Sequence, residues 1–148
     1  MPLKSNSLRD KDIVRILKSQ NVKLNGIHMK DELPAKLKKG FYIVNLQSSK
    51  EGNGSHWTGL YYSPKCSYYF DSYGFVPPIE VENKIKPYIY NDIDIQSYSS
   101  TACGYYCIAF IIYMNSQKNK LEGFNAFVQH FSRQTKENDK TLYNLLYN

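Results

Sequence analysis

The chain has 148 residues, of which 42% are hydrophobic and 15% aromatic, so it can bury a sizeable core and is expected to form one domain over residues 1–148. Its three cysteines and the lack of an apolar signal segment at the N-terminus fit a reducing compartment and argue against a disulfide scaffold. The formal charge is +6, and residues 1–50 hold 11 of the 19 Lys and Arg but only 4 of the 13 Asp and Glu. Such a basic surface suits a polyanion such as nucleic acid, and equally a solvated face that keeps the protein soluble.

The first 40 residues predict one helix followed by irregular chain. Ser7-Leu-Arg-Asp10 has the form of a capping box, and apolar residues then recur at helical spacing, which predicts a helix from about residue 8 to 19. Asn25-Gly26 interrupts this pattern. Residues 28–39 are polar and contain a proline, so they are expected to form a loop with at most one helical turn.

Three runs rich in aromatic or β-branched residues follow and predict strands. They are Gly40 to Leu46, His56 to Tyr62, and Ser67 to Asp71. The turn Ser63-Pro64-Lys65 joins the last two as a hairpin. Further elements are expected at about residues 79–86 (helix), 92–96 (short strand), 124–131 and 141–147 (amphipathic helices). The mixture predicts an α+β fold.

The stretch from Thr101 to Met114 has no charged side chain and predicts a buried helix at the centre of the core. It is too short for a membrane span, which needs roughly 18 apolar residues. Ser99, Ser100 and Thr101 are suitable N-cap residues, which places Cys103 in the first helical turn. A helix N-terminus favours a thiolate over a thiol, so Cys103 is the candidate nucleophile.

A cysteine protease also needs an imidazole, a group that orients it and donors for the oxyanion. His56 begins one strand of the hairpin and Asp71 ends the other, and in an antiparallel pair these two positions lie side by side. Gln96 precedes Cys103 by seven residues, so its amide can point into the same cleft. The glycine next to the nucleophile, Gly104, is explained if a substrate chain approaches closely there.

Three segments together resemble adenain, the maturation protease of adenoviruses, whose family is related to the proteases that process SUMO-like modifiers. The segments are Gly54-Ser-His56-Trp57, Tyr69-Phe-Asp71-Ser-Tyr-Gly-Phe75, and Gln96-Ser-Tyr-Ser-Ser-Thr-Ala-Cys103-Gly-Tyr-Tyr-Cys107. The similarity covers about residues 40–115. It implies the papain-like or adenain-like fold, in which a mixed or antiparallel sheet packs on a buried helix that starts at the nucleophile.

The resemblance implies His56 as general base and acid, Asp71 as its orienting carboxylate where adenain has glutamate, Gln96 as oxyanion donor, and Cys103 as nucleophile. Substrate would be bound by Gly54, Trp57 and Gly104. The implied function is that of a viral endopeptidase that cleaves capsid or other structural precursors in the virion and in the host cytoplasm or nucleus. With Lys outnumbering Arg 16 to 3, the sequence also suggests an AT-rich genome, as in a DNA virus, virophage or virus-like transposon.

Adenain is activated by DNA and by a viral peptide bound through a cysteine upstream of its catalytic glutamine. The segment between Asp71 and Gln96 contains no cysteine, and only Cys66 is a remote candidate for such a bond. DNA or peptide activation is therefore an open expectation, and the chemistry itself needs no cofactor. We expect a monomer that does not bind membranes.

Two alternatives remain. The first is a protease that removes ubiquitin-like or SUMO-type modifiers, although those enzymes use two tryptophans and this chain has only Trp57. The second is a catalytically idle module that binds DNA or capsid. Of the other reactive side chains, Cys107 is expected in the core and His28 and His130 near solvent, and no cluster with metal-ligand spacing predicts a metal site.

Overall fold

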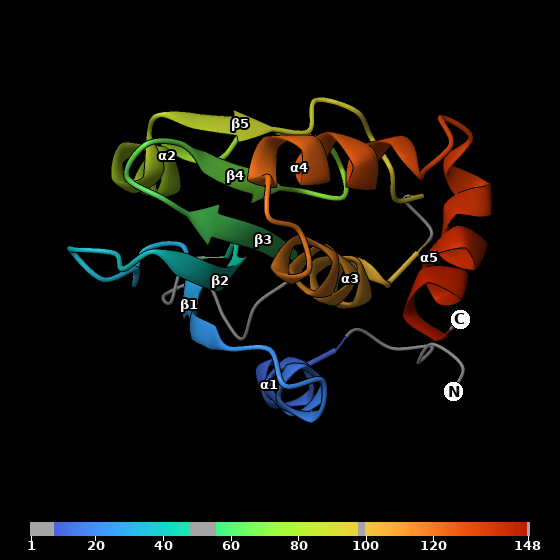
Figure 1. Cartoon of the computed structure of the whole chain (residues 1–148), viewed down its shortest axis with the longest axis horizontal. Coiled ribbons are helices and arrows are strands. Elements are labelled where there is room, and N and C mark those ends of the chain that lie inside the picture. Colours follow the sequence, from blue (N-terminus) through green and yellow to red (C-terminus); the bar gives the residue numbers. More distant parts are fainter. Residues whose placement is uncertain (1–7, 48–55, 98–99, 148) are drawn as a thin grey trace.

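The computed structural model describes residues 8–47, 56–97 and 100–147 (Figure 1). Its helices are α1 (Asp10–Ser19), α2 (Ile79–Ile85), α3 (Cys103–Asn115), α4 (Lys120–Gln129) and α5 (Asn138–Tyr147), with a 3-10 turn η1 (Thr135–Glu137). Its strands are β1 (Leu24–Met29), β2 (Gly40–Asn45), β3 (Trp57–Tyr62), β4 (Ser67–Phe70) and β5 (Tyr88–Tyr90). The predicted α+β class and the three predicted central strands are confirmed.

The strands form one mixed sheet in the order β1-β2-β3-β4-β5. The central strands β2, β3 and β4 are antiparallel, whereas β1 and β5 run parallel to their neighbours at the two edges. The hairpin brings the start of β3 next to the end of β4. The residues before β3 and the residues after β4 therefore lie together at one end of the sheet.

Helix α3 packs against β3 on one face of the sheet, with α1 and α4 on either side of it (Figure 1). Its second half can lie close to the strand because β3 carries Gly59, where an added Cβ would come within 2.7 Å of the Phe110 ring. The large core contains nearly all of α3, as its charge-free sequence predicts. A smaller core on the other face joins α2 to the sheet.

The edge strands differ from the sequence-based expectations. Residues 24–29 form β1, where a break and a loop were expected, and the pairing shifts register between Leu24 and Gly26. This irregularity accommodates the Asn25-Gly26 pair within an edge strand. At the other edge, residues 88–90 form the strand that was expected at 92–96, since Tyr88 and Tyr90 pair with β4.

The helix starts also differ in detail from the expectation. The N-cap of α1 is Arg9, whose backbone N–H donates to the Asp12 carboxylate. This is two residues later than the capping box predicted at Ser7 and Asp10, of which Ser7 lies outside the described residues. At α3 the N-cap is Ala102 in place of a serine or threonine. Within the described part of the chain, none of the helices is both long and apolar enough to cross a bilayer.

Candidate active site

His56 and Asp71 meet at the sheet end that the hairpin defines. The distance from His56 Nε2 to Asp71 Oδ1 is 2.7 Å, and the Asp71 side chain is fully buried. The backbone carbonyl of His56 accepts from the Leu46 N–H, so the residue continues the pairing of β3 with β2. The imidazole and the carboxylate thus lie next to each other, as the sequence predicted.

Asp71 is held by two further groups. The side-chain amide of Asn91 accepts from the Asp71 N–H at 2.9 Å and donates to the Asp71 carbonyl at 2.5 Å. The Tyr73 N–H donates to Oδ1, the same oxygen that contacts His56. The other oxygen, Oδ2, is buried and has no hydrogen-bond partner among the described residues. Sequence reasoning missed Asn91, because its role depends on β5 lying next to β4.

Cys103 is the first residue of α3 and is buried. It interacts with the side chain of His56 and helps to raise the pKa of that imidazole. Since Nε2 of His56 is occupied by Asp71, Nδ1 is the ring nitrogen left to face the sulfur. The N-cap residue Ala102 has no side chain that could accept from the N–H groups of the first helical turn, so they are not consumed by an ordinary cap.

The environment of His56 stabilises the charged imidazolium. Burial of the ring is the largest influence and by itself lowers the pKa, but the hydrogen bonds to Asp71 and Cys103 and the charges of these two groups together outweigh it. The pKa of His56 rises from 6.5 to about 9. The ring of Tyr73 also stacks on the imidazole, with centroids 4.6 Å apart and planes 24° apart. This stack restricts the orientation of the ring.

Gln96 is fully buried in the segment between β5 and α3. Its Oε1 accepts from the Ser72 hydroxyl at 2.5 Å, and its Nε2 donates to the Ser100 carbonyl at 2.9 Å. The sequence placed Gln96 at the end of a strand, but it lies in a loop that these hydrogen bonds hold. Ser72 belongs to the Asp71-Ser-Tyr-Gly74 motif, which was the one sequence signal for its involvement.

The loop that leads into α3 is tied to the start of α5. The Ser100 hydroxyl donates to the Asp139 carboxylate at 2.8 Å, and the Tyr106 hydroxyl donates to the same carboxylate at 2.9 Å. Asn138 donates to the carbonyl of Ile95 at 2.8 Å. These contacts connect residues 33 to 43 positions apart, and no local sequence pattern indicated them.

The residues proposed for substrate binding have different surroundings. Trp57 is mostly buried, and its indole N–H donates to the Leu8 carbonyl at 2.9 Å. It also lines a hollow of about 320 Å³ together with residues of α1, β1 and the following turn. At Gly104 the approaching chain is the protein's own Leu8, whose Cβ would lie 3.1 Å from an added Cβ, so a substrate is not needed to explain this glycine. Gly54 lies outside the described residues.

The remaining cysteines and histidines do not join the site. Cys107 is fully buried, and burial raises its pKa well above the ordinary value. Cys66 is half-buried at the distant hairpin and is a free thiol. His28 lies half-buried in β1, and His130 is exposed after α4. In the described ranges, His, Cys, Asp and Glu form no group suited to a metal ion.

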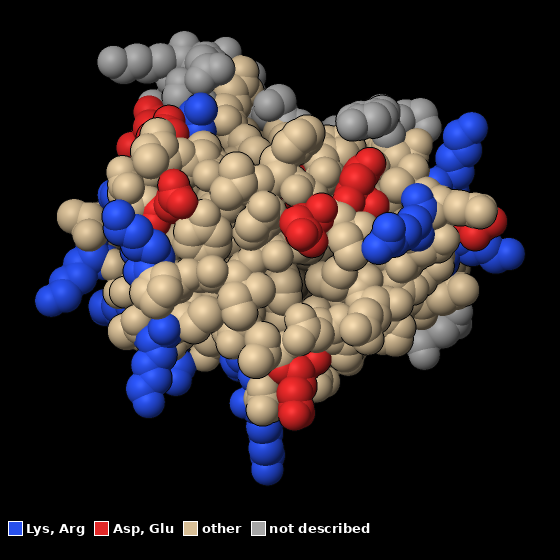
Figure 2. All heavy atoms as spheres, turned by 90° about the horizontal axis from the view of Figure 1, so that it is seen from above, with Lys and Arg blue, Asp and Glu red and all other residues tan. Residues whose placement is uncertain are grey.

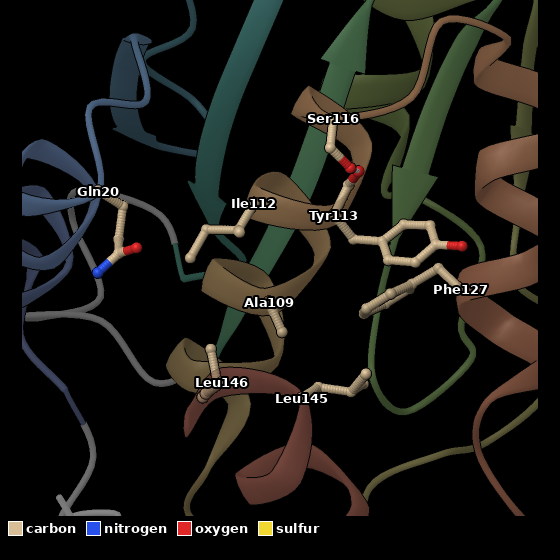
Figure 3. A pocket seen from close by; sticks show the side chains of 8 residues that line it. All are labelled: Gln20, Ala109, Ile112, Tyr113, Ser116, Phe127, Leu145 and Leu146. Atoms are coloured by element: carbon tan, nitrogen blue, oxygen red, sulfur yellow. Dashed lines mark hydrogen bonds between the residues drawn. The ribbon is translucent and has the colours of Figure 1, made fainter. Parts of the chain in front are cut away.

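An apolar cavity of about 250 Å³ lies among the helices rather than at the catalytic end (Figure 3). It is lined by Gln20, by Ala109, Ile112, Tyr113 and Ser116 of α3, by Phe127 of α4, and by Leu145 and Leu146 of α5. Neither Cys103 nor His56 lines it, so the site is defined by polar contacts at the N-terminal end of α3 and not by this cavity.

No protein-family model and no curated protein matches the sequence. Among solved structures, the chain is similar to the selenomethionine form of the ASFV pS273R protease, with a TM-score of 0.62 and 14% identity. The similarity covers 98% of this chain and 69% of that protein. The chain therefore has the fold of a viral cysteine protease, the papain-like fold shared with proteases of ubiquitin-like modifiers, as predicted.

Proposed function

We propose that the protein is a viral cysteine endopeptidase in which Cys103 is the nucleophile, His56 the general base and acid, Asp71 its orienting carboxylate, and Gln96 an oxyanion donor. The observation that carries the proposal is the 2.7 Å contact between His56 and Asp71 next to the helix start at Cys103. Three residues from separate elements supply the thiol, the imidazole and the carboxylate that such a mechanism requires.

The first half of the reaction forms an acyl-enzyme. Cys103 passes its proton to His56, and the sulfur attacks the scissile carbonyl carbon while the carbonyl π electrons move to oxygen. The resulting oxyanion accepts from the backbone N–H of Cys103 and from the Gln96 amide. When the tetrahedral intermediate collapses, the C–N bond breaks and His56 gives its proton to the leaving amine.

The second half restores the enzyme. His56 takes a proton from water, the hydroxide attacks the thioester carbonyl, and the C–S bond breaks to release the carboxylic acid, while His56 returns its proton to the Cys103 sulfur. Asp71 favours the imidazolium that forms in both halves, which agrees with the raised pKa of His56, about 9. Tyr73 keeps the ring aligned by stacking on it.

A protein substrate is supported by an exposed apolar surface that begins beside the site. Tyr73 contacts His56, and the chain continues from there into a group of solvent-exposed apolar side chains: Phe75 (59% exposed), Val76 (53%), Ile79 (61%) and Ile93 (36%). We name these four residues the apolar rim. Ile93 belongs to it because its backbone packs against Gly74. Exposed apolar groups of this kind mark surfaces that bind other proteins.

The substrate we propose is a capsid or other structural precursor, cleaved during virion maturation in the virion or the host cell. The support is the resemblance to adenain in the segments around His56, Asp71 and Cys103, together with the fold that the chain shares with a viral protease. The adenain-like assignment and the origin from a DNA virus or virus-like element with an AT-rich genome rest on the same resemblance.

A SUMO-type isopeptidase is the alternative enzyme. Such enzymes grip the diglycine tail between two tryptophans, whereas here Trp57 is the single tryptophan and its indole N–H is bound to Leu8. The idle-module alternative leaves the His56–Asp71 contact unexplained, because a binding module has no need of a buried carboxylate on an imidazole.

Nucleic acid is a further proposed partner, at the end of the sheet opposite the site. Lysines precede β1, β2 and β5 and lie in the β3–β4 and α3–α4 connections: Lys23, Lys38, Lys39, Lys65, Lys86 and Lys118, all exposed. Lys and Arg side chains project along the left edge of Figure 2, where this end lies. Binding of a labelled DNA duplex that weakens steeply with added salt would support this role, and equal binding by a variant with Lys38 and Lys39 changed to Gln would contradict it.

The function itself is tested by incubating the protein with capsid precursors of the source virus and sequencing the new termini. Cleavage by the wild type and none by Cys103→Ala supports the endopeptidase. Release of a SUMO-type modifier from a lysine side chain, without cleavage of the precursor, would favour the isopeptidase. Absence of both activities would favour the binding module.

A further inference from the structure

The side-chain amide of Gln96 is held at both of its ends inside the protein. The Ser72 hydroxyl donates to Oε1 at 2.5 Å, and Nε2 donates to the Ser100 carbonyl at 2.9 Å. Ser72 and Gln96 are both fully buried, so water does not replace these partners easily. One of the two N–H bonds of Nε2 is used by Ser100, and the oxyanion role proposed above would use the second.

The orientation of this amide matters because only its NH₂ end can donate to an oxyanion. The Ser100 carbonyl can only accept, so it selects Nε2. The Ser72 hydroxyl then donates to Oε1. If the amide were rotated by half a turn, its oxygen would face the Ser100 oxygen and the buried donor would be lost, which costs about 1 to 3 kcal/mol for an unsatisfied group.

Ser72 also holds the backbone that carries Gln96. Its carbonyl accepts from the N–H groups of both Ile95 and Gln96, each at 2.8 Å. Ser72 is the residue after Asp71, whose carboxylate contacts His56. A single peptide unit thus connects the carboxylate that orients the imidazole with the contacts that orient the oxyanion donor.

We propose that Ser72 is a positioning residue for the oxyanion hole: its hydroxyl holds Oε1 of Gln96 in place, while the Ser100 carbonyl selects Nε2, so that the second N–H of the amide can donate to the developing oxyanion. This inference rests on the proposed peptidase function and adds to it a residue that the resemblance to adenain did not assign. The simpler reading is that Ser72 only stabilises the segment before α3. The two readings differ, because loss of a serine that only stabilises this segment would lower the free energy of unfolding and leave kcat of the folded enzyme near the wild-type value.

The test is a double-mutant cycle on a fluorogenic peptide substrate with Ser72→Ala, Gln96→Ala and the double variant. Ser72→Ala keeps the backbone hydrogen bonds and removes only the hydroxyl. We expect it to lower kcat by about 10- to 100-fold with KM changed less than about 3-fold, since one preorganised donor is displaced. In the Gln96→Ala background the same change should cost less than about 3-fold. Equal losses in both backgrounds, or no loss in the wild type, would overturn the proposal.

Ser67→Ala is the matched control. Ser67 is also fully buried, and its hydroxyl is bonded to Ser63 in the hairpin at the opposite end of the sheet. The Ser67→Ala variant loses a buried serine hydroxyl that makes no hydrogen bond to Gln96. Its kcat should therefore stay within about 2-fold of the wild type, and urea unfolding of both serine variants shows whether a loss of stability accompanies the change.

A second measurement does not depend on activity. In ¹⁵N-labelled Cys103→Ala protein, the side-chain NH₂ signals of Gln96 should shift and exchange with solvent at least about 10-fold faster when Ser72 is also changed to Ala, because the amide is released. Unchanged signals would overturn the positioning role even in an active enzyme. If the wild type cleaves no peptide at all, the proposed function fails, and the NMR result alone decides how Gln96 is held.

Discussion

Nε2 of His56 lies 2.7 Å from Oδ1 of Asp71, and the two residues are 15 positions apart in the chain. The contact follows from the short hairpin between β3 and β4, which places the residue before one strand next to the residue after the other. Asn91 and the Tyr73 N–H fix the carboxylate from its other sides. The contact between these two side chains is therefore part of the sheet framework.

The first prediction concerns the charge of His56. Its pKa is raised from 6.5 to about 9, so His56 stabilises the folded protein fully below pH 6.5, and this contribution is lost as the pH rises through about 9. The leaving amine needs a protonated imidazole, so kcat should fall above about pH 9. Asp71→Asn removes the charge that favours the imidazolium, and the pKa of His56 should drop.

An NMR titration of the histidine ring protons measures this shift. His28 serves as an internal control, because burial of its own ring lowers its pKa despite the charge of Glu32, and Asp71 is not among the causes. Its titration should be the same in the wild type and in Asp71→Asn. An unchanged His56 titration in the variant would refute the assigned role of the carboxylate.

The second prediction separates the cysteines. Cys103→Ala should abolish cleavage with the fold intact, whereas Cys107→Ala should keep substantial activity, because Cys107 is fully buried one turn along α3 and its raised pKa keeps it a thiol. Iodoacetamide labelling followed by peptide mass spectrometry should modify Cys103 first. Cleavage by Cys103→Ala, or labelling of Cys107 or Cys66 that coincides with loss of activity, would move the nucleophile elsewhere.

The third prediction is that Gln96 acts on the transition state. An oxyanion forms only after the thiolate has attacked, so Gln96→Ala should lower kcat by about 100- to 1000-fold and change KM only a few-fold. Alkylation of Cys103 should be unaffected, which checks that the nucleophile is intact. A normal kcat with a raised KM would instead place Gln96 in the substrate groove.

The fourth prediction is that Asn91 stabilises the site. Asn91→Ala would leave both backbone groups of Asp71 buried without their partner, at a cost of about 2 to 4 kcal/mol in the free energy of unfolding. Asn119→Ala is the control, because Asn119 caps α4 at the surface and its loss should cost about 1 kcal/mol. Urea denaturation measures the free energy of unfolding of both variants. An equal decrease in the two would show that the buried contacts of Asn91 stabilise the protein no more than the surface cap does.

The fifth prediction tests the apolar rim. Phe75 is 59% exposed, so Phe75→Ser should leave stability nearly unchanged. If the rim binds the protein substrate, kcat/KM for a precursor protein should fall by about 10-fold, while hydrolysis of a short peptide changes less than about 2-fold. Leu121→Ser, at an exposed leucine of α4 outside the rim, should change neither rate. Equal effects of the two substitutions would remove the rim from the substrate path.

The sequence by itself determined the elements whose signals are local. Aromatic and β-branched runs around a Ser-Pro-Lys turn specified the hairpin, and from it the neighbourhood of His56 and Asp71. A charge-free run specified the buried helix with Cys103 at its start. These features depend on side-chain periodicity and turn chemistry within a few residues, which the chain displays directly.

Only the tertiary structure decided how the site is held. Residues far apart in the chain determine which segment becomes the edge strand next to β4. They also determine which side chains form hydrogen bonds with Asp71 and Gln96, and which residue packs against Gly104. Asn91 lies 20 positions from Asp71, and Ser72 lies 24 positions from Gln96. Such buried polar groups take whichever partners the packing brings within hydrogen-bond distance, so their pairing is a property of the folded chain and leaves no periodic pattern in the sequence.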